Sequence, residues 1–139
     1  MNLFDMRKRD RELQEMSKMM LDISKKKDLI EILDELDLFK DIEVYFTIPK
    51  KVEEANLSTL PFSDSAFNVL NTYCLRNNLD FTVKSILPLV TGDNWKHLRS
   101  VGKKKICNIK SVVLSACFNA YTDEQKQDFF YYLLDRNFD

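Results

Sequence analysis

One of the two glycines in this chain of 139 residues is followed directly by three lysines, Lys103, Lys104 and Lys105. The surrounding residues 95–113 (WKHLRSVGKKKICNIKSVV) predict a short helix, a turn at Gly102 and a second helix that begins on the lysines. We expect Gly102 to provide a positive φ or a close backbone approach, which glycine tolerates at little cost. The free amides of the second helix, its positive end and the lysines then form a phosphate site. An ordinary helical hairpin with a solvated turn is the alternative.

The distribution of charge favours the phosphate site. The net charge of the chain is −1, but residues 76–118 carry eight Lys and Arg against two Asp, a net charge of +6. The flanking segments are acidic: residues 1–56 carry −3, residues 57–75 carry −1 and residues 119–139 carry −3. A basic segment inside an acidic protein indicates a local site for a polyanion. A helix-hairpin-helix holds a nucleic-acid backbone in this way without reading its bases.

The composition gives little support to other chemistries. With one histidine, His97, the chain lacks a Ser/His/Asp triad and a multi-histidine metal site, and two glycines cannot form a nucleotide-binding loop. The cysteines Cys74, Cys107 and Cys117 have no Cys-x-x-Cys spacing, and we expect all three to be buried on apolar faces. No membrane span or secretion signal is recognisable. We therefore expect a non-enzymatic, cytoplasmic protein that uses no cofactor and no metal.

The low content of glycine and proline predicts an all-α fold. Helices are expected over residues 2–27 and 28–41, followed by a short strand or extended segment at residues 42–48. Residues 49–58 are charged and weakly patterned, so we expect a linker there.

The first helix carries an apolar stripe at a/d spacing. A stripe of this kind either packs on its own domain or forms the seam of a homodimer, and both interpretations stay open. Its members are Met6, Leu13, Met16, Met20 and Ile23.

The predicted organisation is an N-terminal helical segment, residues 1–56, followed by a compact helix-hairpin-helix domain with an extra C-terminal helix, residues 57–139. Ser63 is the expected N-cap of the first helix of this domain. A short helix that ends near Pro88 and another over residues 92–101 follow.

The last two helices of the domain have clear apolar patterns. A long helix over residues 103–119 is expected to turn Ile106, Ile109, Val113 and Ala116 inward. A capping box, TDEQ at residues 122–125, begins the final amphipathic helix. We expect its apolar side to dock onto the domain through Phe129, Phe130, Leu133 and Leu134.

Residues 60–113 resemble the C-terminal domain of the bacterial RNA polymerase alpha subunit. The opening helix of that family follows the pattern Leu-x-Leu-Ser-x-Arg-x-x-Asn-x-Leu, and its hairpin reads roughly Leu-x-x-x-x-x-Leu-Gly-Lys-Lys-Ser-Leu-x-Glu-Ile-Lys. In LPFSDSAFNVL the matching residues are Leu60, Phe62, Ser63, Asn68 and Leu70. In WKHLRSVGKKKICNIK they are Trp95, Val101, Gly102, Lys103, Lys104, Ile106, Ile109 and Lys110.

The resemblance implies a compact helical unit that binds the minor groove of A/T-rich DNA and contacts transcription activators. It also implies phosphate and groove contacts from Asn68, Gly102, Lys103 and Lys104. This chain departs from the family at three positions, with Ser65 in place of the groove-reading arginine, Lys105 in place of serine and Asn108 in place of glutamate. Loss of the arginine weakens A/T readout, whereas the added lysine strengthens sequence-independent attraction. The polymerase-assembly domain of the family has no counterpart here.

These observations predict a DNA-binding, transcription-associated accessory protein, with RNA polymerase or a transcription regulator as a further partner and no membrane contact. The alternative is a protein-interaction module that mimics the polymerase domain, such as a phage or mobile-element protein that binds or inhibits a host complex. The predicted contacts to double-stranded DNA are Asn68, Arg99, Gly102, Lys103, Lys104, Lys105, Asn108 and Lys110.

Overall fold

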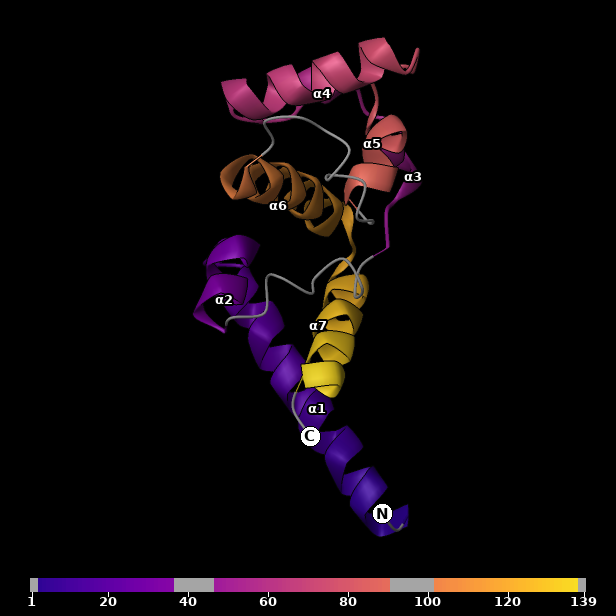
Figure 1. The fold of residues 1–139 in the computed structure, drawn as a ribbon. Helices are drawn as coiled ribbons and strands as arrows, with labels where there is room; N and C mark the ends of the chain where they lie inside the picture. The colour runs from indigo at the N-terminus through magenta and orange to yellow at the C-terminus, as the bar shows by residue number, and fades with distance from the viewer. Residues whose placement is uncertain (1–2, 37–46, 91–101, 138–139) are drawn as a thin grey trace. The chain divides into compact units, whose positions relative to one another are not determined.

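The computed structural model describes residues 3–36, 47–90 and 102–137, and these residues confirm the all-α fold (Figure 1). Along the chain the elements are α1 (Leu3–Ser24), α2 (Leu29–Glu35), α3 (Lys50–Glu53), the 3-10 turn η2 (Leu57–Thr59), α4 (Asp64–Arg76), α5 (Val83–Val90), α6 (Lys103–Ala120) and α7 (Asp123–Asn137). The helix expected at residues 92–101, and most of the strand expected at residues 42–48, lie outside the described residues.

The chain forms two compact units. Unit 1 consists of residues 1–46 and 121–139, and unit 2 consists of residues 47–120. This division differs from the one predicted, which placed residues 57–139 in one domain. The reason is that α7 packs against α1 and therefore belongs with the N-terminal helices.

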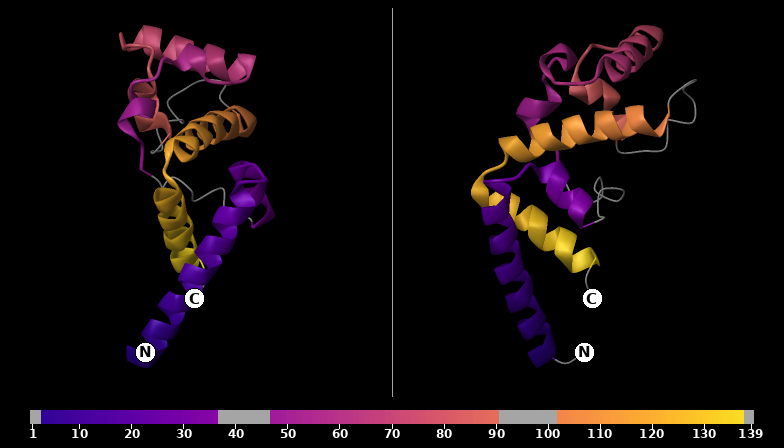
Figure 2. Two further views of the ribbon diagram at one scale, coloured as in Figure 1. Left: turned by 180° about the vertical axis from the view of Figure 1, so that it is seen from behind. Right: turned by 90° about the vertical axis from the view of Figure 1, so that its left-hand side faces the viewer.

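Unit 1 is built on the pairing of α1 with α7, which lie side by side (Figure 2). The predicted capping box starts α7: the Thr122 amide donates to Gln125 Oε1 at 2.9 Å, and the Gln125 amide donates to Thr122 Oγ1 at 3.1 Å. The predicted apolar side of α7 is buried, and burial of this area stabilises unit 1. Its members are Phe129, Phe130, Leu133 and Leu134.

Polar contacts join the edges of the α1–α7 pair. Arg9 Nη2 lies 3.2 Å from Asp135 Oδ1. The Tyr131 hydroxyl donates to the Asp10 carboxylate, and this hydrogen bond raises the pKa of Tyr131 to about 12. Exposed ion pairs of this kind contribute little stability. We therefore infer that these contacts mainly align the two helices.

The predicted apolar stripe of α1 is only partly buried. Leu13 and Met20 are 5% and 8% exposed, and Ser17 between them is fully buried. The stripe therefore packs within its own chain at two positions and leaves apolar side chains at the surface elsewhere. The exposed members are Met6, Met16 and Ile23.

The linker predicted at residues 49–58 is instead an integral part of unit 2. It contains α3 and the start of η2, and the side chains of Val52 and Leu57 are buried. The Leu57 amide donates to the Phe81 carbonyl at 3.1 Å, and the Val83 amide donates to the Ala55 carbonyl at 3.1 Å. Two buried side chains in a charged segment are too few to produce a visible hydrophobic period.

The remainder of unit 2 packs α4, α5 and α6 together. Ser63 caps α4 as predicted, because its hydroxyl accepts from the Ala66 amide at 3.2 Å. The rings of Phe67 and Phe81 meet edge to face with centroids 5.3 Å apart. Fully buried side chains from all three helices form the core, among them Leu70, Ile86, Ile109, Val113 and Leu114.

The helix expected to end near Pro88 is α5, which is described as far as Val90. Proline removes one helical amide donor. The apolar residues that follow offset this loss, since Leu89 and Val90 are 0% and 1% exposed.

The expectation that all three cysteines are buried is wrong for one of them. Cys74 and Cys117 are buried in unit 2, whereas Cys107 is exposed on α6. Burial raises the pKa of the Cys117 thiol to about 12 and also raises the pKa of Cys74. Because the thiolate is the reactive form, the two buried thiols are protected by both access and ionisation.

We predict that a thiol reagent at pH 8 modifies one cysteine of the native protein quickly and the other two only as fast as the protein unfolds. Peptide mapping should identify the fast site as Cys107, and Cys107→Ser should abolish the fast phase. Rapid modification of Cys74 or Cys117 without denaturant would contradict the burial of these thiols in the core of unit 2.

Candidate nucleic-acid interface

The beginning of α6 presents backbone donors beside two of the predicted lysines. The first hydrogen bond closed within the helix runs from the Ile106 amide to the Gly102 carbonyl at 3.2 Å. The amides of Lys103 and Lys104 therefore have no acceptor within the helix. Gly102 has no side chain with which to cap them. These donors are therefore suited to an external anion.

Gly102 does not have the geometry that the sequence suggested. Its φ is not positive, and a Cβ built on it would meet no atom within 4 Å. Neither turn geometry nor close packing within the described residues therefore explains the glycine. It occupies the N-cap position of α6, where glycine is well tolerated.

The charge at this end of α6 is unusual. Acidic side chains are favourable in the first turn of a helix, where they oppose the positive end of the dipole, as Asp64 in α4 and Asp123 in α7 illustrate. The first turn of α6 contains no acid, and its first three residues are lysines. The ammonium groups therefore add to the positive end of the helix dipole instead of opposing it.

One exposed face collects most of the predicted lysines. Lys103 and Lys104 are exposed, and Cys107 lies one turn further on the same side because it is spaced by four and three residues from them. Lys110 continues this side at half exposure. We call these four residues the α6 lysine face. Lys105 is half-exposed and belongs to a different side of the helix.

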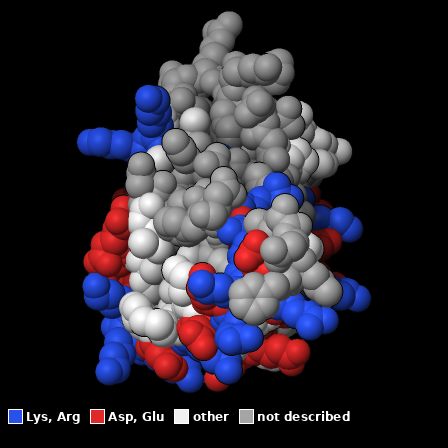
Figure 3. All heavy atoms as spheres, turned by 90° about the horizontal axis from the view of Figure 1, so that it is seen from below, with Lys and Arg blue, Asp and Glu red and all other residues white. Residues whose placement is uncertain are grey.

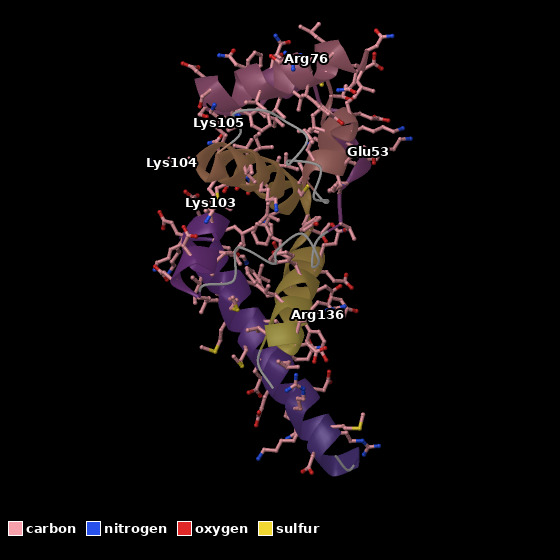
Figure 4. All side chains as sticks on the ribbon, in the orientation of Figure 1. Glu53, Arg76, Lys103, Lys104, Lys105 and Arg136 are labelled. Carbon is pink, nitrogen blue, oxygen red and sulfur yellow. The ribbon has the colours of Figure 1, made fainter. Side chains whose placement is uncertain are left out.

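Lys103 and Lys104, at the start of α6, are the central residues of the candidate site. Neither Lys103 nor Lys104 forms an ion pair with any described residue. Figure 4 shows Lys103, Lys104 and Lys105 gathered at the start of α6, whereas Arg76 lies at the far end of α4.

The side chain of Asn108 positions the helices of unit 2. Its Oδ1 accepts from the Ser63 amide at 3.0 Å, which connects the start of α4 to the second turn of α6. Both helices consequently begin on the same side of unit 2 (Figures 1 and 2). This hydrogen bond gives Asn108 a positioning role, and its predicted contact to DNA stays a prediction.

The other predicted contacts are placed as follows. Asn68 is exposed on α4, on the side opposite the buried Leu70 and Ala66. Arg99 lies outside the described residues. Sequence reasoning missed Cys107 as a member of the exposed face, although its spacing from the lysines could have indicated it.

The division into units sharpens the charge segregation. Unit 2 carries ten Lys and Arg against five Asp and Glu, a net charge of +5. Unit 1 carries eleven against seventeen, a net charge of −6. The lysine face therefore belongs to a unit that is basic as a whole, which favours attraction of a polyanion.

Comparison with protein-family models, with curated proteins and with solved structures finds no match for this chain. Among the described helices, none combines the length and the apolar character needed to cross a bilayer.

We predict that Gly102→Ser leaves the free energy of unfolding unchanged or raises it by a few tenths of a kcal/mol, because serine is a slightly better N-cap than glycine. Urea denaturation followed by circular dichroism measures the change. A loss of more than about 1 kcal/mol would mean that glycine is required at this position for its conformational freedom.

Proposed function

We propose that this chain binds the phosphate backbone of double-stranded DNA through the α6 lysine face, as a transcription-associated accessory protein. One observation carries the proposal: Lys103 and Lys104 begin α6, whose first turn contains no acid, and neither lysine forms an ion pair with a described residue. In the free protein this arrangement is unfavourable, because both cations lie near the positive end of the helix dipole. A phosphate group bound at the first turn would remove that penalty and would accept from the amides of Lys103 and Lys104.

The arrangement of unit 2 supports the proposal from a second direction. The Asn108–Ser63 hydrogen bond joins the two segments that carry the resemblance to the polymerase alpha C-terminal domain, which are 45 residues apart. Helices α4, α5 and α6 follow one another in the order expected from the sequence. The lysine face is thereby held on a packed scaffold and not on a loop.

The proposed contact is insensitive to DNA sequence. Lysine provides a point charge and not the planar fork with which arginine reads bases or a narrow groove. Ser65, which stands where the resembling family has its groove-reading arginine, is exposed and short. We therefore assign the affinity to backbone phosphates and counterion release.

Titration of the protein against A/T-rich and G/C-rich duplexes tests this assignment. With about three to five phosphate contacts, log K against log salt should have a slope of about −3 to −4.5. The two duplexes should bind with affinities within about threefold of each other. Fluorescence anisotropy at several salt concentrations measures both quantities. Absence of binding near 50 mM salt, which is low enough to favour phosphate contacts, contradicts the proposal.

The double variant Lys103→Glu with Lys104→Glu separates the site from the fold. DNA affinity should fall at least about tenfold. The free protein should become more stable by about 0.3–1 kcal/mol per position, because acids at a helix start interact favourably with the dipole.

The matched control is Lys50→Glu with Lys51→Glu on α3. Both control lysines are exposed in unit 2, and the pair changes the net charge by the same amount. DNA affinity should fall much less in the control. Equal loss in both double variants would mean that net charge, and not the start of α6, accounts for binding.

A module that mimics the polymerase domain is the second candidate. The specific observation that favours it is the serine at position 65 together with the acidic unit 1. The same Lys103→Glu and Lys104→Glu protein distinguishes the two functions. Recovery of polymerase or a transcription regulator by this variant, with no DNA binding by the unmodified chain, favours the mimic.

A further inference from the structure

An apolar groove opens on unit 1 between α1, α2 and α7. It has a volume of about 240 Å³. Its floor is formed by one side chain from each helix, Met20, Ile32 and Leu134, which are 8%, 4% and 2% exposed. The groove is therefore part of a packed unit, and it adjoins the α1–α7 pairing described above.

The rim of the groove is apolar and open to solvent. Met16, Met19, Ile23 and Leu36 line it and are 41%, 63%, 43% and 39% exposed. Half of the eight large apolar side chains that are exposed among the described residues thus gather at one place. Such clustering indicates an interaction surface, and the unbranched methionines adapt readily to a facing helix.

Charged residues mark the two ends of this surface along α1. Met16, Met19 and Ile23 are spaced by three and four residues and so form one stripe. Glu12 lies four residues before the stripe and extends it by one turn. Lys26 lies three residues after the stripe, in the turn that follows α1.

The ionic contacts within unit 1 leave these two charges unused. Of the three lysines after α1, Lys25 lies 3.6 Å from Asp123 and Lys27 lies 3.0 Å from Glu35. Lys26, between them, and Glu12 form no ion pair with any described residue, and both are exposed.

The α1 helix of a second copy of the chain is complementary to this pattern when it runs antiparallel to the first. In a twofold arrangement centred on the stripe, Glu12 of one copy lies level with Lys26 of the other to within about 1.5 Å, the rise of one residue. Two opposite-charge pairs then flank an apolar centre. A parallel arrangement instead brings Glu12 against Glu12 and Lys26 against Lys26, which is repulsive.

The charged side chains beside the stripe on α1 are of both signs, since Glu15, Lys18 and Asp22 are all exposed. On the face drawn in Figure 3, Lys and Arg are likewise interspersed with Asp and Glu. A polyanion or a uniformly basic helix needs a field of one sign, whereas a mixed surface can be complementary to itself.

We propose that unit 1 carries a homodimerisation surface. Met16, Met19 and Ile23 of two antiparallel α1 helices pack together in it, and Glu12 of each copy pairs with Lys26 of the other. The surface differs from the stripe predicted from sequence, because Leu13 and Met20 of that stripe are buried within unit 1. This interface is independent of the proposed contact with DNA.

Sedimentation velocity of the full chain from about 1 to 200 μM tests the proposal, since this range covers weak to moderate dimers. We expect concentration-dependent dimers and a shift to monomers for Met19→Glu. The control Leu75→Glu removes an exposed apolar side chain from α4 of unit 2, 73% exposed, and should dimerise normally. A monomer throughout the range, or dimers unchanged by Met19→Glu, overturns the proposal.

A charge exchange tests the antiparallel pairing itself. Glu12→Lys should weaken dimerisation at least about tenfold, because each dimer contains the pair twice. Adding Lys26→Glu to that variant should restore the affinity of the unmodified chain, which a merely misfolded variant could not do. Failure of the double variant to recover would reject the pairing of these two residues.

Discussion

The burial of the apolar side of α7 against α1 determines how the whole chain is organised. Phe130, Leu133 and Leu134 are buried on the C-terminal helix, which packs against α1, where Leu13 and Met20 are buried near the other end of the sequence. Because of this pairing, residues 121–139 belong to unit 1 with the N-terminal helices, and residues 47–120 form unit 2. Since the α7 segment is acidic, the same pairing leaves the second unit with its full basic surplus.

Within unit 2, the lysines at the start of α6 lower the stability of that helix, and burial of the core offsets the loss. A helix that begins on three lysines is less stable than one that begins on an acid, by an amount typical of dipole interactions. The core beneath it, with Ile109, Val113 and Leu114 fully buried, is large enough to offset that penalty. The Asn108–Ser63 contact then connects α6 to the start of α4, so that the lysine face lies on an anchored helix.

Local sequence signals predicted those features that depend on a few neighbouring residues. The Ser63 cap of α4 and the reciprocal capping box at Thr122 and Gln125 are hydrogen bonds across three residues, and both are present. The start of α6 on Lys103 follows from the same kind of signal. The linker assignment of residues 49–58 was wrong because this segment packs against α5 and α6 and bonds to Phe81 and Val83, all of which are distant in sequence.

The sequence by itself determined the all-α fold, the starts of α4, α6 and α7 and the concentration of positive charge around Lys103 and Lys104, because composition, capping and charge order are properties of adjacent residues. Only the tertiary structure decided that Asn108 supports α4, that Cys107 is exposed and Cys117 is not, and that Met16 and Met19 remain at the surface while Met20 is buried. Residues on one helix share the same local pattern. Which of them meets solvent depends on the element that packs against that helix, and that element is distant in sequence.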